Sequence, residues 1–175
     1  VDVRPADVAD SPAITDIYAG HVLHGTATFE ITPPDVAEMT ARMRAIADAG
    51  HPWIVAARGG KVVGYAYAGP YRARPAYRYT TEDSIYLAPD AVGQGIGRRL
   101  LEVLIDACTR RGDRQMIAVI GDSGNAASVA VHAATGFVHV GTLANAGRKF
   151  DRWIDVVMMQ RALGDGARTP PGGVA

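Results

Sequence analysis

The sequence predicts an α/β (α+β) domain with one central mixed sheet that is flanked by helices on both sides. Two observations support this fold class. Apolar residues recur at helical spacing before residue 50, and between residues 53 and 69 their period changes to 2. After residue 80, strand-like and helix-like segments alternate along the chain. Residues 1–163 contain no linker and form a single predicted domain, whereas residues 164–175 are rich in Gly and Pro and are predicted to be a disordered tail.

In the first half of the chain we predict a strand over 1–4, a helix that starts at Asp7 or Asp10, a loop over 21–32 that carries Phe29, a helix from Asp35 to Gly50, and hairpin strands over 53–57 and 61–69. A loop over 70–79 and a strand over 80–87 follow, and then a helix over 98–111, a strand over 115–120 and a helix over 125–135. The last predicted strands are 137–140 and 153–160, and residues 141–152 bridge them. Asp and Pro suit helix starts, and Arg58-Gly59-Gly60 favours a hairpin. Residues 115–120 form a continuous apolar run, which suits a strand buried on both faces.

The most informative stretch is the junction of strand, glycine loop and helix between residues 83 and 112. The apolar run Ile85–Leu87 stops at Pro89, and three glycines follow at alternate positions, at 93, 95 and 97. Glycines leave backbone N–H groups accessible to a ligand, and a helix start adds unpaired N–H groups and the positive end of its dipole. The junction therefore predicts a phosphate site. Its spacing matches neither a nucleoside triphosphate loop nor a dinucleotide fingerprint.

The composition limits the class of partner. Lys plus Arg and Asp plus Glu both number 18, so nothing suggests the broad basic face that nucleic-acid or anionic-membrane binding requires. Cys108 is the one cysteine, which excludes an internal disulfide and a thiolate metal cluster, and we predict no metal site. No run approaches the length of a membrane span, and no signal peptide is visible. We expect a cytoplasmic protein that binds small molecules.

Several motifs in this order resemble a known family. Gly95-Ile96-Gly97 follows a strand, Asn125 opens a later helix, and His132 precedes Gly136-Phe137, as in the GNAT superfamily of N-acetyltransferases. Val92 departs from that pattern, because the superfamily has Arg or Gln at this position. The segments that resemble the phosphinothricin and methionine sulfoximine/sulfone N-acetyltransferases are TATFE (26–30), GPYRARPAYRYTTEDSIY (69–86), AVIGDSGN (118–125) and WIDV (153–156).

The resemblance covers roughly residues 2–163 and implies a GNAT fold, with a mostly antiparallel sheet. It also implies an enzyme that transfers acetyl from acetyl-CoA, as co-substrate, directly to the α-amine of phosphinothricin, methionine sulfoximine or methionine sulfone in a ternary complex. A homodimer is expected, with the aromatic loops and the last strands as its interface.

The same resemblance assigns residues to the cofactor. The strand before the glycine loop meets the pantetheine arm and the acetyl carbonyl, with the Leu87 N–H as the oxyanion donor. The Asn125 amide contacts the CoA arm, and it also suits a helix N-cap. The expected cofactor-binding residues are Ile85, Tyr86, Leu87, Gly93, Gln94, Gly95, Ile96, Gly97, Arg98 and Asn125.

The expected catalytic groups are a base and an acid. Glu82 is the candidate general base, because an α-ammonium must lose a proton before it attacks a thioester. Asp83 is next in line if strand alternation points Glu82 outward. His132 is the candidate general acid, since imidazolium can donate to sulfur near neutral pH. The alternative for His132 is a helix histidine bonded to a backbone carbonyl.

The expected acceptor site prefers an anionic ligand. Arg72, Arg74 and Tyr77 should bind a carboxylate or phosphinate, because guanidinium groups offer forked donors. By resemblance, Phe29 and Val156 are apolar walls and Gly121 is a backbone contact. We expect Cys108, Trp53 and Trp153 to be packing residues, and we expect no metal at His21 and His24.

Two other functions are open to this sequence. The same fold could acetylate another amine, such as a protein N-terminus, a lysine or a polyamine, although a short basic loop favours a small anionic acceptor. The chain could also be a non-catalytic acyl-CoA-binding sensor, for which Val92 in the glycine loop is the only hint.

Overall fold

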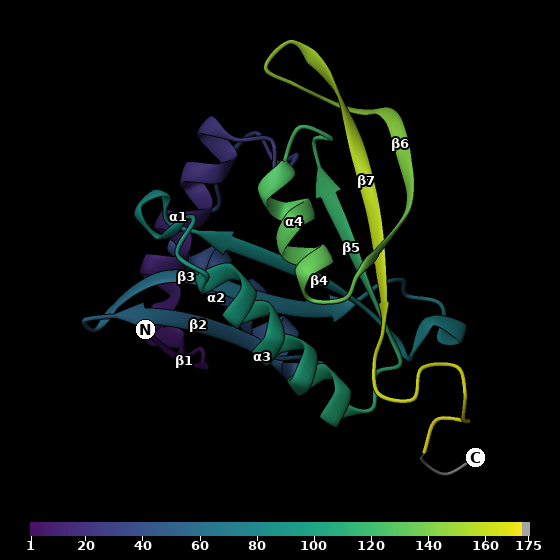
Figure 1. The fold of residues 1–175 in the computed structure, drawn as a ribbon. Coiled ribbons are helices and arrows are strands. Elements are labelled where there is room, and N and C mark those ends of the chain that lie inside the picture. Colours follow the sequence, from purple (N-terminus) through teal and green to yellow (C-terminus); the bar gives the residue numbers. More distant parts are fainter. Residues whose placement is uncertain (173–175) are drawn as a thin grey trace.

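A computed structural model describes residues 1–172 of the chain (Figure 1). The strands are β1 (Asp2–Pro5), β2 (Trp53–Arg58), β3 (Lys61–Pro70), β4 (Thr80–Leu87), β5 (Gln115–Gly121), β6 (Val138–Lys149) and β7 (Arg152–Ala162). The helices are α1 (Ser11–His24), α2 (Val36–Asp48), α3 (Ile96–Arg111) and α4 (Ala126–Ala134), with short 3-10 turns at Val8–Asp10, Pro75–Tyr77 and Pro89–Ala91. Over these residues no helix is long and apolar enough to cross a membrane.

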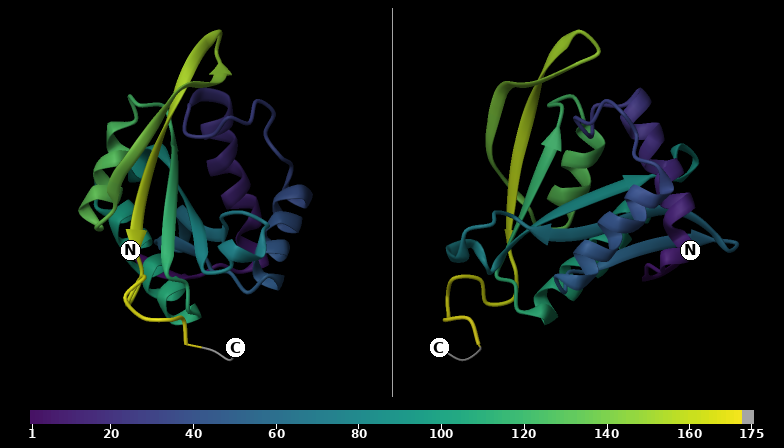
Figure 2. Two further views of the ribbon diagram at one scale, coloured as in Figure 1. Left: turned by 90° about the vertical axis from the view of Figure 1, so that its right-hand side faces the viewer. Right: turned by 180° about the vertical axis from the view of Figure 1, so that it is seen from behind.

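All seven strands form one sheet in the order β1-β2-β3-β4-β5-β7-β6. β4 and β5 are parallel and every other neighbouring pair is antiparallel, which confirms the predicted mixed, mostly antiparallel sheet. Helices α3 and α4 cover one face, and α1 and α2 cover the other (Figure 1, and Figure 2 from behind). Each face has its own core, one centred on the fully buried Leu100, Leu101 and Leu104 and the other on Ile14, Val55 and Tyr65.

β4 and β5 diverge half-way along β4, and this separation creates the candidate functional site. Their parallel pairing begins at Thr80 with Gln115 and ends at Asp83 with Ala118. On its other edge β4 stays paired with β3 as far as Leu87. The second half of β4 therefore has one edge without a strand partner. Figure 1 shows the two strands diverging, with α3 and α4 packed in front of them.

The loop predicted over residues 21–32 begins later than expected. α1 continues to His24 and ends at Gly25. Ile14, Tyr18 and Val22 are buried at intervals of four residues, so they extend one apolar stripe along the helix. The prediction was wrong for residues 21–24 because the irregular sequence around Val22 conceals the continuation of this stripe. Likewise, α3 begins at Ile96 and not at residue 98.

The bridge predicted over residues 141–152 is also wrong, because most of it belongs to β6. This strand pairs with β7 from Val138 to Lys149, with register shifts on either side of the pairs at residues 141–143. Nearly all its side chains are exposed, so there is no alternation of buried and polar residues to reveal a strand. Trp153 of β7 is not a packing residue either, since 61% of its surface is exposed.

Two smaller expectations differ from the structure. Val119 in β5 is 39% exposed, so this strand is not fully buried on both faces; it lies where β4 has diverged. Residues 164–172 form turns, and Arg114 donates hydrogen bonds to the carbonyls of Gly166 and Pro170. These contacts join part of the expected tail to the domain, while residues 173–175 lie outside the described residues.

Candidate active site

A cavity of about 530 Å³ occupies the gap between the diverging strands β4 and β5. α4 and the glycine loop close its other sides. The predicted residues that line it are Ile85, Tyr86, Leu87, Gly93, Gly95, Gly97, Arg98, Gly121, Asn125 and His132. Gln94 and Ile96 are not among its lining residues, and Ile96 is buried in the core. The structure thus gathers most of the predicted cofactor residues around one opening.

The backbone of β4 faces this cavity with unpaired groups. The Ala88 N–H donates to the Val63 carbonyl of β3 at 2.9 Å, and successive residues of a strand point their N–H groups in opposite directions. The N–H of Leu87 therefore points away from β3, toward the edge that β5 has left. The Leu87 carbonyl accepts a hydrogen bond from His21 Nε2 at 2.9 Å, so α1 helps to hold this residue. An oxyanion donor requires an N–H group in this orientation, and the role of Leu87 stays a prediction.

The glycine loop has the conformation that the sequence suggested. Gly93 and Gly95 have φ values of 77° and 76°, in the left-handed region that favours glycine. Gly95 is the N-cap of α3, so the first N–H groups of this helix open toward the loop. A Cβ at either glycine would meet no atom within 4 Å, which leaves open space above the backbone. An anion can approach these N–H groups.

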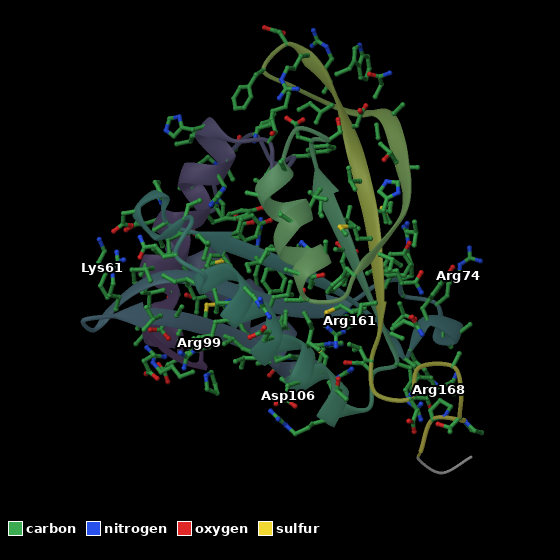
Figure 3. All side chains as sticks on the ribbon, in the orientation of Figure 1. Lys61, Arg74, Arg99, Asp106, Arg161 and Arg168 are labelled. Carbon is green, nitrogen blue, oxygen red and sulfur yellow. The ribbon has the colours of Figure 1, made fainter. Side chains whose placement is uncertain are left out.

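The side chain of Gln94 is directed to the hairpin β2–β3 and not to the cavity. Arg58 donates to Gln94 Oε1 at 2.9 Å and to Asp90 Oδ2 at 2.7 Å, and Gln94 Nε2 donates to the Asp90 carbonyl. These three residues connect the glycine loop to the β2–β3 turn, near Lys61 in Figure 3. Val92 lines the cavity and is 55% exposed. Because its side chain is apolar, it adds no polar group there.

His132 and Asp83 form a buried pair at the inner wall of the cavity. His132 Nε2 lies 2.9 Å from Asp83 Oδ2, and both residues line the opening although they are only 2% and 5% exposed. His132 Nδ1 is 2.7 Å from the Ser128 carbonyl and must donate, because a carbonyl only accepts. Burial alone would lower the pKa of His132, but the hydrogen bond and charge of Asp83 outweigh it and leave that pKa raised. The pair therefore favours a protonated imidazole.

Glu82 lies on the opposite face of β4 from Asp83. Alternation along the strand puts Thr81 and Asp83 on the α3–α4 side, where they are buried, and leaves Glu82 half-buried on the α1–α2 side. Burial raises the pKa of Glu82, the charge of Asp83 adds to this effect, and Arg72 opposes it. Glu82 is not among the residues that line the cavity, but it precedes Asp83, which is, and a half-buried carboxylate with a raised pKa is a suitable proton acceptor.

Phe29 is held between two strands at positions where only glycine fits. Its ring lies against Gly121 of β5 and Gly147 of β6, and a Cβ at Gly147 would collide with the ring. Lys149 Nζ reaches the same segment and donates to the Thr28 carbonyl at 3.0 Å. The loop after α1 is thereby fastened to the β6–β7 hairpin, which places Phe29 beside Gly121 at the edge of the cavity.

The other residues predicted to bind the acceptor do not lie close together in the structure. Arg72 lies near enough to Glu82 to affect its pKa, and its guanidinium stacks 5.0 Å from the Tyr71 ring. Arg74 and Tyr77 are exposed, and Arg74 points away from the domain in Figure 3. Val156 is buried in β7 and pairs with Gly121 of β5. Within residues 1–172, Arg74 and Tyr77 do not line the cavity between β4 and β5, and neither do Phe29, Arg72, Glu82 and Val156.

Three residues at the cavity were missed or undervalued in the sequence. The sequence predicts only that His21 does not bind a metal, and in the structure its Nε2 donates to the Leu87 carbonyl because α1 extends past it. Asp83 was considered only as a substitute for Glu82, yet it is the partner of His132. Ser128 supplies the backbone carbonyl that accepts from His132 Nδ1, as in the alternative given above for this histidine; the interval of four residues between them on a helix was the available signal.

The comparison with protein families decides the identity of this fold. Residues 17–137 match the model of the acetyltransferase (GNAT) family. The chain belongs to the GNAT family of acetyltransferases. Both the predicted family and the predicted GNAT fold are confirmed, and the glycine loop before α3 and the diverging strands fall within the matched residues.

Individual GNAT relatives are similar over nearly the whole chain. A phosphinothricin N-acetyltransferase from Alcaligenes faecalis is 59% identical over 169 residues, which cover 97% of this chain and 86% of the relative. An L-methionine sulfoximine/L-methionine sulfone acetyltransferase from Pseudomonas paraeruginosa is 41% identical, with 97% and 98% covered. The crystal structure of a phosphinothricin acetyltransferase from Sinorhizobium meliloti in complex with AcCoA is 48% identical and superposes with a TM-score of 0.95, covering 99% of this chain and 94% of that chain.

Proposed function

We propose that this GNAT enzyme transfers acetyl from acetyl-CoA to the α-amine of a small amino acid analogue, namely phosphinothricin, methionine sulfoximine or methionine sulfone. The observation that carries the proposal is the separation of β4 from β5. It opens a cavity that has a glycine loop at one end and unpaired strand backbone along one side. His132 lines this cavity, and Glu82 precedes the lining residue Asp83 in β4.

The residues of the cavity suit each part of acetyl-CoA. The N–H groups of the glycine loop and of the first turn of α3 would hold the pyrophosphate. The free edge of β4 from Ile85 to Leu87 would pair with the pantetheine arm, and the Leu87 N–H would polarise the acetyl carbonyl. Acetyl-CoA supplies the activated thioester. Asn125, whose Oδ1 caps α4 at Ser128, would offer its amide N–H groups to the arm.

Glu82 would take the proton of the acceptor ammonium. Its carboxylate is half-buried, so the neutral form is favoured more than in water, and its raised pKa brings it nearer to that of an amine. Arg72 lies close by and would bind the anionic end of the acceptor. A small amino acid analogue carries both groups that these two residues would recognise.

His132 would be the general acid that donates a proton to the departing CoA thiolate. Asp83 keeps the imidazole charged, and the Ser128 carbonyl fixes its orientation. Cys108 does not serve as an acyl carrier in this scheme. Its side chain is fully buried in α3, and burial together with the charge of Asp113 raises its pKa to about 12. The acetyl group would pass directly between the two substrates.

The proposed assembly is a homodimer through the last two strands. β6 is the edge of the sheet and carries exposed apolar residues, among them Val138, Val140 and Leu143, and Trp153 of β7 is exposed nearby. An unpaired edge with an apolar surface is a site for association. Light scattering of the purified chain is expected to give twice the mass of one chain, and a monomer at micromolar concentration would contradict this part of the proposal.

The test of function is thiol release from acetyl-CoA with a panel of amines. Phosphinothricin, methionine sulfoximine and methionine sulfone are expected to be the best acceptors, ahead of lysine, spermidine and a peptide N-terminus. Glu82→Gln is expected to lower kcat about a hundredfold or more. Asp106→Asn, an exposed change on the outer side of α3 (Figure 3), is the matched control and should have no effect. CoA binding without turnover of any amine would favour a sensor and overturn the proposal.

A further inference from the structure

The last residue of β4 has both of its backbone polar groups on the edge that β5 has left. The pairing of β4 with β5 ends at Asp83, whereas its pairing with β3 continues to Leu87. Successive residues of an antiparallel strand direct their N–H and C=O groups to alternate sides. Because the Ala88 N–H faces β3, the N–H and the C=O of Leu87 both face the vacated edge. The Leu87 carbonyl therefore needs a donor from elsewhere in the fold.

His21 supplies that donor. Its Nε2 lies 2.9 Å from the Leu87 carbonyl oxygen, and this nitrogen must carry a hydrogen because a carbonyl only accepts. His21 belongs to the last turn of α1, the helix that lies beside the end of β4 (Figure 2). The bond connects the end of β4 to α1 at the position where a neighbouring strand would otherwise hold it.

The His21 ring is itself held by packing. It lies edge-on to the Tyr86 ring, with centroids 5.2 Å apart and planes at 61°. The Tyr86 ring also contacts that of Tyr18, which precedes His21 by three residues on α1, at a centroid distance of 5.1 Å. Tyr18 is buried in the core between α1, α2 and the sheet. Because the imidazole is already packed on this cluster, its hydrogen bond costs less side-chain entropy than that of a free side chain.

Three contacts together fix the orientation of Leu87. Its side chain packs so closely on Gly64 of β3 that a Cβ at this glycine would collide with it. On one edge of β4, the Ala88 N–H binds the Val63 carbonyl. On the other edge, the bond from His21 holds the Leu87 carbonyl, and both residues line the cofactor cavity. Loss of the His21 donor would leave this carbonyl unsatisfied on the side of the cavity.

The group beside this carbonyl gives the contact its importance for the reaction. The Leu87 N–H lies on the same edge and is the proposed donor to the acetyl carbonyl. Such a donor is effective when its direction is fixed before the reaction begins. The carbonyl oxygen of Leu87 would oppose the negative charge that develops on a nearby thioester oxygen, and a donor from His21 offsets part of this repulsion.

We propose that His21 is a positioning residue for acetyl transfer, which replaces the missing strand at Leu87 and holds the Leu87 N–H toward the thioester carbonyl. It acts through Leu87 and not on the reacting atoms. This inference rests on the proposed function, because it concerns the oxyanion donor of that reaction.

The first test removes the donor and then restores it. His21→Leu keeps an apolar side chain against Tyr86 but cannot donate, so kcat with methionine sulfone is expected to fall about tenfold, while the KM for acetyl-CoA stays within about threefold. His21→Gln places an amide nitrogen at nearly the position of the imidazole Nε2, and it should keep kcat within about threefold of wild type.

His24→Leu is the matched control for these variants. His24 lies in the same turn of α1 with its side chain exposed, so this change should leave kcat within about twofold. Equal kcat values for wild type and His21→Leu would overturn the inference. An equal fall in His21→Leu and His21→Gln would also overturn it, because the donor would then have no part in the effect.

A spectroscopic measurement separates this inference from the proposed acceptor. Acetyl-CoA that is isotope-labelled at the thioester carbonyl carbon is bound in the absence of any amine, and its carbonyl band is recorded by infrared difference spectroscopy. A hydrogen bond from the Leu87 N–H lowers the frequency of this band relative to free acetyl-CoA, and the shift should fall by about half or more in His21→Leu.

The two hypotheses fail on different outcomes. If the wild-type protein turns over no amino acid analogue, the proposed function fails, whereas the carbonyl band still reports on His21. If the protein turns these analogues over but the band has the same position in wild type and in His21→Leu, only the role of His21 fails.

Discussion

Two buried aspartates in this domain belong to clusters that each contain a histidine, and the pKa values of these two histidines shift in opposite directions. Asp83 and Asp113 are 5% and 3% exposed, and each has one carboxylate oxygen without a hydrogen-bond partner in residues 1–172. Asp83 faces His132, whose pKa is raised. Asp113 binds Arg111, which also lies 3.1 Å from His51 Nε2. Burial, with the Arg111 charge, lowers the pKa of His51 to about 4.

The difference teaches that burial of a charged cluster does not by itself identify an active site. The Arg111–Asp113 pair joins the end of α3 to the turn after α2, where Arg111 also donates to the Gly50 carbonyl. It lines no part of the cofactor cavity. The Asp83–His132 pair lies where β4 and β5 separate, so only this pair can reach a ligand between the strands.

The largest expected difference between the two clusters is in the effect of replacing each histidine. His132→Gln is expected to lower kcat about a hundredfold, because a positioned acid contributes on this scale. His51→Gln should leave kcat within twofold. Both variants would be assayed by thiol release at saturating substrates. Equal kcat values for the two variants would remove His132 from the proposed chemistry.

Substitution of Asp83 is expected to affect kcat, whereas substitution of Asp113 is expected to affect stability. Asp83→Asn is expected to lower kcat about tenfold and to move the alkaline limb of the pH profile to lower pH. The reason is that His132 loses the carboxylate that keeps it protonated. Asp113→Asn should lower Tm, since it leaves Arg111 without its partner, and should leave the pH profile in place. A pH profile that does not move in Asp83→Asn would show that Asp83 has a packing role alone.

The two histidines should also give opposite pH dependence of stability. The raised folded pKa of His132 means that its pair stabilises the fold below the unfolded pKa of about 6.5, and that this stability is lost as pH rises through the folded pKa. For His51 the folded pKa is depressed to about 4, so stability is full above pH 6.5 and is lost as pH falls toward 4.

Urea denaturation at pH 8 and pH 5 measures the loss of stability that is due to His51. His51→Gln should lose less stability than wild type between these two values, and an equal loss in both proteins would show that His51 is not the group responsible.

Much of the fold and part of the site followed from local chemistry in the sequence. The glycines at 93 and 95, the hairpin at Gly59-Gly60 and the buried stripe of α3 act within one or two turns of chain, so their patterns predicted them. Motifs read as a family resemblance then indicated the cofactor residues that line the cavity. The exposed β6 had no alternation to reveal it, and the irregular apolar end of α1 concealed its helical stripe.

The amino-acid sequence by itself therefore determined the order of the elements, the glycine loop before α3 and the family. The tertiary structure alone decided which side chains meet. Asp83 and His132 are 49 residues apart, and their contact depends on the face of β4 that Asp83 occupies and on the place where β5 diverges. The position of Phe29 between Gly121 and Gly147 likewise requires strand register. Register and divergence arise from packing of the whole sheet, which no short segment encodes.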